Sequence, residues 1–338
     1  MENKNIYDSA CQLADKLTKI DFEKLPISDY NKAYINRLKP AFHYYMSIYA
    51  RCITQGLESF KGNINETTLV DFGGGSGFLS IFASYLGFRN IIYVDINPKS
   101  VQTVSVLKEE TGYGPSTIIE GSSAALAKRC TENNVSPHLL IATDLIEHVY
   151  DLNPMFDELS AINNQMTMIF TTASTPFNPI VKRRLHKAMV ACEKGNMENP
   201  NYYTLRFDFI KKELPNASDD EVAKLAELTR GMIFQDIRKA IESNNFPQTA
   251  DRYNTCDPRN GNWMERILPI SSYEELGKKH GYTINVEKGF YNVRRNKPLA
   301  ATLCKAINCF IRKSGKSRIF TCSFHHSAIQ LQEIKVHS

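Results

Sequence analysis

The sequence predicts an α/β fold built on a doubly wound, mostly parallel sheet of seven strands. The main observation is that short apolar runs alternate with segments of helical spacing. These runs lie at 68–72, 90–95, 116–120, 138–143 and 166–172. A second observation is a glycine-rich turn directly after the first run. In such a sheet, ligands bind outside the carboxyl ends of the strands.

Four regions follow from this reading. Residues 1–60 have helical spacing and form an N-terminal cap, and residues 61–175 form the core with the five runs. Residues 176–270 are expected to be a helical insertion, or substrate lid, over the active face. A capping box at Ser218 and Glu221 opens one helix there, with an apolar face that extends to Ile241. Residues 271–338 complete the sheet with strands near 283–293 and 319–332 and contain an amphipathic helix.

Composition narrows the function classes. The chain has 338 residues, 42% hydrophobic and 23% charged, with a net charge of +5, which is ordinary for a globular protein. Its basic clusters alternate with acidic stretches, which argues against a nucleic-acid partner. The eight cysteines form no C-x-x-C pair, and the first residues are not apolar, so we expect reduced thiols and a cytoplasmic location. Oligomeric state is left open.

The glycine turn is suited to close contact with a ligand. Gly73, Gly75 and Gly77 lack a Cβ atom, so the backbone can approach a ligand and adopt positive φ values. A dinucleotide-binding turn would have glycine where Phe78 stands. The spacing is instead Asp-x-Gly-x-Gly-x-Gly, beginning at Asp71. A plain strand-to-helix connection is the alternative explanation.

Two further strand ends suit an adenosine group. Asp95 closes the second strand, where a carboxylate can accept both ribose hydroxyls, and Ile96 can pack on the base. After the third strand, Ser122 is placed to bond the adenine edge. The alternatives are structural, since Asp95 precedes a helix start and Ser122 can cap the helix that follows it.

Together, the segment from Asp71 to Gly77, Asp95, and the Asp144–His148 segment resemble class I S-adenosylmethionine-dependent methyltransferases. The ubiquinone O-methyltransferase-like branch (methyltransferase type 11) is the most similar. The resemblance covers about residues 64–175 and resumes faintly at 271–282. It implies a Rossmann-like fold with S-adenosylmethionine as cofactor. By this resemblance the cofactor residues are Asp71, Gly73, Gly75, Gly77, Asp95, Ile96, Ser122, Ser123 and Asp144.

The resemblance also assigns parts of the cofactor to these residues. Asp71, Gly73 and Gly75 would hold its methionine end, Asp95 its ribose, and Ser122 with Ser123 the adenine edge. One position departs from the pattern, because many members of the family have aspartate where this chain has Ser122.

Methyl transfer from a sulfonium is an in-line displacement that needs alignment and exclusion of water. A hydroxyl acceptor must also lose a proton, and His148, with Glu147 beside it, is the candidate base. The structural alternative is a histidine satisfied by backbone groups. His186 and Glu265 are weaker candidates for the base.

A divalent metal at Asp144, Glu147 and His148 is a second, less favoured use of this turn. The resemblance permits it, because some ubiquinone-type and small-RNA 2'-O-methyltransferases look similar here and use a metal. The RNA enzymes need a further histidine, for which His186 is poorly spaced.

Acceptor recognition is expected from the insertion, with Trp263, Arg266 and His186 as its candidate residues. Trp263 can stack on a substrate while Arg266 or Arg259 holds an anionic group. A tryptophan that fills the join between the lid and the sheet is the favoured alternative. The helix over 297–318 is expected to pack on the sheet edge, with peripheral membrane contact as the less favoured choice.

The sequence therefore predicts methyl transfer from S-adenosylmethionine to a small-molecule acceptor, at a hydroxyl oxygen. Two alternatives stay open. One is a metal-assisted RNA or sugar hydroxyl methyltransferase. The other is a catalytically silent cofactor-binding subunit that supports a partner.

Overall fold

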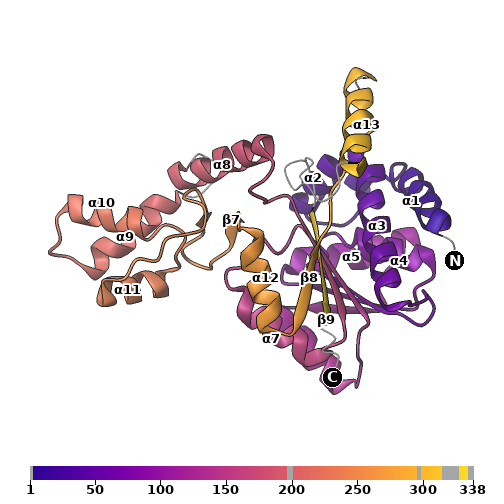
Figure 1. The fold of residues 1–338 in the computed structure, drawn as a ribbon, viewed down its shortest axis with the longest axis horizontal. Helices are drawn as coiled ribbons and strands as arrows, with labels where there is room; N and C mark the ends of the chain where they lie inside the picture. The colour runs from indigo at the N-terminus through magenta and orange to yellow at the C-terminus, as the bar shows by residue number, and fades with distance from the viewer. Residues whose placement is uncertain (1–2, 196–200, 295–297, 314–326, 334–338) are drawn as a thin grey trace.

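The computed structural model describes residues 3–195, 201–294, 298–313 and 327–333 (Figure 1). One sheet organises the chain, with the strand order β3-β2-β1-β4-β5-β9-β8. The first five strands in this order pair in parallel, whereas β9 pairs antiparallel with both β5 and β8. The predicted α/β core with five parallel strands is confirmed.

The core strands and helices alternate as the apolar pattern predicts. Each predicted strand begins within one residue of its observed start, and each turn between strands contains a helix. Glycines with positive φ end the helices α4 and α5 at Gly87 and Gly112. The bounds are β1 Thr68–Phe72, α4 Phe78–Leu86, β2 Asn90–Asp95, α5 Pro98–Thr111, β3 Thr117–Glu120, α6 Ser123–Glu132, β4 Leu139–Thr143, α7 Leu152–Ile162 and β5 Thr167–Thr172.

Both faces of the sheet are covered, because side chains of successive strand residues point to opposite faces. Leu69 and Ile141 pack with the N-terminal helices and α4. Their neighbours Val70 and Leu140 pack on the other face with residues of α6, α7 and α12. This double burial explains why β1 and β4 read as nearly continuous apolar runs.

The N-terminal cap consists of helices that cover one sheet face. They are α1 Asn3–Leu17, α2 Asp29–Leu38 and α3 Phe42–Phe60, with 3-10 turns η1 Phe22–Lys24 and η2 Lys39–Ala41. Phe22, Phe42 and Phe78 form an aromatic cluster that joins this cap to α4, with ring centroids 4.9 to 6.3 Å apart. The predicted helical character of this region is confirmed.

The insertion is helical, but its arrangement differs from the prediction. It contains α8 Pro179–Lys194, α9 Tyr202–Glu213, α10 Asp219–Leu228 and α11 Phe234–Ser243. The capping box opens α10 as predicted, but the single helix to Ile241 is wrong. Gly231 has φ +80 and lies between α10 and α11. In Figure 1 the helices α9 to α11 project to one side of the sheet, and the role of the insertion as a substrate lid stays a prediction.

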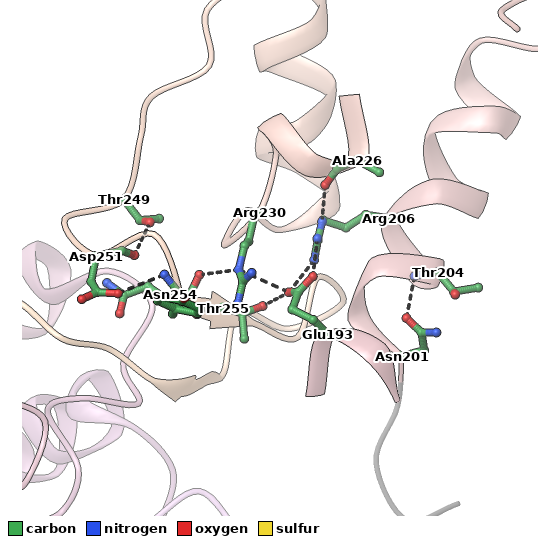
Figure 2. A network of polar contacts seen from close by, with 11 residues as sticks. Glu193, Asn201, Thr204, Arg206, Ala226, Arg230, Thr249, Asp251, Asn254 and Thr255 are labelled. Atoms are coloured by element: carbon green, nitrogen blue, oxygen red, sulfur yellow. Dashed lines mark hydrogen bonds and ion pairs between the residues drawn. The ribbon is translucent and has the colours of Figure 1, made fainter. Parts of the chain in front are cut away.

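A buried ion-pair network holds this insertion together (Figure 2). The guanidinium of Arg206 is 1% exposed and donates two hydrogen bonds to Glu193, at 2.7 and 3.1 Å, and one to the carbonyl of Ala226. Thr255 donates to the same carboxylate, and Arg230 lies 3.8 Å from it. These contacts join α8, α9, α10 and the returning strand β6.

The chain returns from the insertion to the core through a short antiparallel pair. This pair is β6 Thr255–Cys256 and β7 Trp263–Glu265, followed by α12 Ile270–Lys279 and β8 Tyr282–Val286. The last described strand is β9 Ser327–Glu333. The predicted strands at 283–293 and 319–332 are confirmed only in part, because the first ends at Val286 and residues 319–326 lie outside the described part of the chain.

Helix α13 spans Pro298–Lys313 and stands out from the body of the molecule (Figure 1). Asn308 holds it by bonds to both backbone groups of Tyr291. Leu299 and Leu303 are 88% and 61% exposed, so the expected packing on the sheet edge is wrong. Among the described residues, no helix has the length and apolar character needed to cross a membrane. Peripheral membrane contact stays a prediction, which flotation with acidic vesicles tests.

Candidate functional site

The glycine turn between β1 and α4 has the backbone that its sequence predicts. Gly73, Gly75 and Gly77 have φ values of +67, +53 and +79, which favour glycine. They serve different purposes. A Cβ atom on Gly73 would lie 2.8 Å from Leu145, at the cavity described below. On Gly77 it would lie 2.2 Å from Val104, so Gly77 permits packing against α5.

Asp71 lies beneath this turn. Its Oδ2 accepts hydrogen bonds from the backbone N–H and the hydroxyl of Ser80, at 3.0 and 2.7 Å. Burial raises the pKa of Asp71 to about 7, although the bonds from Ser80 lower it. Asp71 is therefore positioned to fix the start of α4. It does not line the cavity described below, and direct contact with the methionine end of a cofactor stays a prediction.

A cavity of about 520 Å³ opens at the carboxyl ends of β1, β2 and β3. Its size suits a ligand as large as a nucleoside derivative. Asp95 lines it, with Oδ2 accepting from the N–H of Gly75 at 2.8 Å and Oδ1 from Asn97. Ile96 lines it too and is 74% exposed, an apolar side chain available to cover a base. Both predicted adenosine contacts thus face one cavity.

The third wall of this cavity contains Ser122 and Ser123. Ser122 is the N-cap residue of α6, but its side chain makes no capping hydrogen bond. Its structural alternative is therefore wrong, and its hydroxyl does not satisfy the helix start. The hydroxyl of Ser123 donates to Oε2 of Glu158 on α7, at 2.5 Å. Glu158 also lines the cavity and was missed in the sequence analysis.

His148 lies where the cavity meets the end of β4. Its Nδ1 is 2.8 Å from the carbonyl oxygen of Trp263, and the N–H of Trp263 bonds to the carbonyl of His148. Because a carbonyl oxygen only accepts, Nδ1 carries the hydrogen and Nε2 is left as the basic nitrogen of the neutral ring. The returning strand β7 therefore fixes the orientation that a general base needs.

Two glutamates lie beside His148. One ligand atom each from Glu147, His148 and Glu265 fall within 4.8 Å of one another. Glu147 is 2% exposed, and its Oε2 has no hydrogen-bond partner among the described residues. Glu265, on β7, accepts a hydrogen bond from the hydroxyl of Ser174. The sequence predicts Glu265 only as a weaker candidate for the general base.

The charges of this acidic group act on one another. Burial, and then the charges of Asp144 and Glu265, raise the pKa of Glu147 well above its ordinary value. Burial also raises the pKa of Glu265, against the bond from Ser174. Asp144 has φ +53, a conformation that costs a residue with a side chain some strain. Its charge acts on both carboxyls, and it does not line the cavity, so its predicted contact with the cofactor stays a prediction.

The donor set fits a divalent cation. Two carboxylates and one imidazole match the ligands of ions such as Mn²⁺ and Zn²⁺. The unpartnered oxygen of Glu147 is the observation that favours the fit. The candidate metal ligands in the structure differ by one residue from those predicted from the sequence. Glu265 lies with Glu147 and His148, in place of Asp144. His186 is not part of the set.

The charge of Asp144 acts on two tyrosines of the N-terminal cap. Burial raises the pKa of Tyr34 to about 12, and the negative charge of Asp144 adds to this. Burial and the same charge also raise the pKa of Tyr45. The phenols of these two cap residues therefore lie within range of the Asp144 charge. Only their helical spacing marked them in the sequence, which does not distinguish a site residue from a core residue.

Of the three predicted acceptor residues, Trp263 and Arg266 come together, whereas His186 makes its contacts elsewhere. Trp263 is 4% exposed, stacks on Tyr150 at 5.8 Å, and donates to its carbonyl oxygen, as the favoured structural alternative predicts. Arg266 lies over the Trp263 ring and also bonds the carbonyl of Tyr150. His186 bonds Asp251 and stacks on Tyr253 at the base of the insertion. A substrate role for His186 stays a prediction, since its described contacts are with Asp251 and Tyr253.

Comparison with known proteins gives a partial match. Residues 50–134 match the family described as ribosomal protein L11 methyltransferase (PrmA). The ribosomal protein L11 methyltransferase of Photorhabdus laumondii is 32% identical over 97 residues. That alignment covers 29% of this chain and 31% of the relative, so the chain spans about a third of the curated relative that it matches.

Solved structures resemble the chain weakly. PKMT2 from Rickettsia typhi has a TM-score of 0.41 at 13% identity, covering 81% of this chain and 50% of that one. Magnesium protoporphyrin IX methyltransferase from Synechocystis, with bound SAH, has a TM-score of 0.36 at 13% identity, covering 86% and 87%. Neither likeness bears on the function.

The family match includes the glycine turn, Asp95 and Ser122, which are the cofactor residues predicted from the sequence. This region is therefore similar to part of a methyltransferase. The similarity supports the predicted enzyme class, an S-adenosylmethionine-dependent methyltransferase, and its cofactor. The ubiquinone-type branch, the region boundaries and the individual site residues stay predictions.

Proposed function

We propose that this chain transfers the methyl group of S-adenosylmethionine to a hydroxyl oxygen of a small molecule. The cofactor would lie in the cavity at the ends of β1 to β3, with its ribose on Asp95 and its adenine beside Ile96. The acceptor would lie at the end of β4, beside the acidic group. The observation that supports an oxygen acceptor most directly is the fixed orientation of His148.

The chemistry asks little of the protein beyond alignment and one proton transfer. The sulfonium is already an activated leaving group, so the acceptor oxygen attacks the methyl carbon in line and the carbon–sulfur bond breaks. Nε2 of His148 takes the hydroxyl proton, while Nδ1 keeps its bond to Trp263. The carboxyl of Glu265 is close enough to favour the imidazolium that forms.

Calorimetry with S-adenosylhomocysteine tests cofactor binding. Asp95→Ala should weaken binding about tenfold or more, because hydrogen bonds to a charged group are lost. Glu120→Ala is a matched control, since Glu120 lies opposite Asp95 on β3 but is exposed and does not line the cavity. Absence of binding by the unchanged protein would refute the proposal as a whole.

Labelling tests the class of acceptor. The protein is incubated with S-adenosyl-[methyl-³H]methionine and a cell extract, which is then separated into small molecules, protein and RNA. Label in small molecules, lost in His148→Gln, supports the proposal. Label in protein would favour an acceptor like that in the name of the L11 methyltransferases, and would overturn the small-molecule acceptor. Label in RNA supports the RNA alternative, and cofactor binding with no transfer supports a silent subunit.

The unpartnered oxygen of Glu147 favours a second candidate, methyl transfer assisted by a divalent cation on an RNA or sugar hydroxyl. Glu147, His148 and Glu265 would hold the ion, which lowers the pKa of a bound hydroxyl. Mn²⁺ calorimetry should then show binding that Glu265→Gln abolishes. Full activity after chelation, with no Mn²⁺ binding, would exclude this candidate.

The likeness to ubiquinone O-methyltransferases is part of the same proposal. It is supported by the Asp144–His148 segment and by the similarity at 271–282, in α12 and the start of β8. A hydroxylated aromatic ring is the acceptor that this branch implies, and the phenols of Tyr34 and Tyr45 are compatible with such a ring. Methylation of catechols by the purified protein, lost in His148→Gln, is the direct test.

A further inference from the structure

We infer that Glu158 reads the adenine ring of the cofactor by accepting a hydrogen bond from its exocyclic amino group. The inference rests on the proposed function, because it assumes that the cavity binds S-adenosylmethionine. It concerns a residue on α7, outside the three strand ends that carry the predicted cofactor contacts.

The end of β3 lacks a side chain that would bond only to the amino group of adenine. Where many family members have an aspartate, this chain has Ser122. A hydroxyl can donate or accept, so it bonds an amino group or a carbonyl oxygen equally well. An ionised carboxylate only accepts, so it selects the amino group. Ser122 alone would not distinguish adenine from a purine with oxygen at the same position.

A carboxylate reaches this wall of the cavity from helix α7. Glu158 lines the cavity together with Ser122 and Ser123. The Ser123 hydroxyl donates to its Oε2, which fixes the carboxylate at this wall. Within the described residues, no ion pair of Glu158 to a lysine, arginine or histidine is found. Each carboxylate oxygen has two acceptor sites, so one bond from Ser123 leaves Glu158 able to accept another.

Reading of adenine by Glu158 differs from a purely structural role in the ligands that it affects. Ser123 is buried and opens α6, so the bond to Glu158 also ties α6 to α7. If that were the whole role, changing either partner would affect all ligands of the cavity alike. An adenine-reading role predicts instead that the change at Glu158 alters the preference between two purines.

The test is calorimetry with S-adenosylhomocysteine and with S-inosylhomocysteine, in which oxygen replaces the amino group. The unchanged protein should bind the adenosyl compound at least about tenfold more tightly, because the inosyl oxygen would face a carboxylate. Glu158→Gln should reduce this preference to about threefold or less, since an amide can donate to that oxygen. Glu158→Asp, which keeps the charge, should retain part of the preference.

Two controls make the outcome decisive. Glu120→Gln changes a nearby exposed carboxylate that does not line the cavity and should leave the preference unchanged. Ser123→Ala removes the bond that fixes the Glu158 carboxylate and should therefore reduce the preference in part. The inference is overturned if Glu158→Gln keeps the full preference, or if it weakens the binding of both ligands equally. Failure of the unchanged protein to bind either ligand would instead overturn the proposed function.

Discussion

The buried carboxyl of Asp71 should make the folded protein less stable as the pH rises. Its folded pKa is raised to about 7 by burial, above the ordinary value of 3.8. A carboxyl with a raised folded pKa contributes stability that is complete below its unfolded pKa and is lost as the pH rises through the folded pKa. At 1.36 kcal/mol per unit, the full loss is about 4 kcal/mol, and between pH 5 and pH 8 it is about 2.5 kcal/mol.

Asp71→Asn removes this loss, because the amide does not ionise and its oxygen can still accept from Ser80. Urea unfolding of both proteins near pH 5, 6, 7 and 8 should show the variant gaining on the unchanged protein by about 2.5 kcal/mol across this range. A difference that does not depend on pH, or that changes in the opposite direction, would refute the reasoning.

Ser80→Ala gives a second check on the same carboxyl. The hydrogen bonds from Ser80 lower the pKa of Asp71, so loss of the hydroxyl bond should raise this pKa further. The pH at which stability is lost should then move upward relative to the unchanged protein. A shift to lower pH would show that the bond from Ser80 does not favour the charged form.

Three stability predictions follow from other parts of the fold. Gly77→Ala should lower the free energy of unfolding by about 2 kcal/mol or more, because the new Cβ atom would lie 2.2 Å from Val104 in a left-handed backbone. Adding Val104→Ala should recover part of this loss, as measured by urea unfolding. Arg206→Met should lower the free energy of unfolding by about 3–5 kcal/mol, because it leaves Glu193 buried without its main partner. Adding Glu193→Gln should raise the lowered melting temperature part of the way back. Ser218→Ala should lower the free energy of unfolding by about 1 kcal/mol, because the capping box is lost. An unchanged urea midpoint would show that the stability of α10 does not depend on the capping box.

Features that lie within a few adjacent residues could be predicted from the sequence. The five parallel strands can be predicted because burial on both faces makes β1 and β4 nearly continuous apolar runs. The glycine turn was readable because positive φ values restrict the residue type at Gly73, Gly75 and Gly77. Each depends on local chemistry, so each could be recognised without knowing what packs against it.

The insertion shows where local reading fails. Apolar spacing continues from Val222 through Met232 to Ile237, as it would in one helix. In the structure these residues share a small core although Gly231 separates α10 from α11. Two helices that fold against each other can bury the same apolar residues as one longer helix. Periodicity therefore predicted which residues are buried but not where the helix ends.

The acceptor side of the site shows the larger limit, because it is assembled from distant parts of the chain. The segment Asp144–His148 has a recognisable pattern, but Glu265 reaches it only after the whole insertion has folded back. The return segment is held at both ends, by Thr255 on the Glu193 carboxylate of the insertion and by Trp263 on the backbone and ring of His148. A local motif thus gives the histidine and one carboxyl, whereas the orientation of that histidine and the second carboxyl depend on the insertion. Changes in α9 to α11 should therefore alter methyl transfer before they alter cofactor binding, since these helices do not line the cofactor cavity, whereas Asn260 to Asn262 of the return segment do.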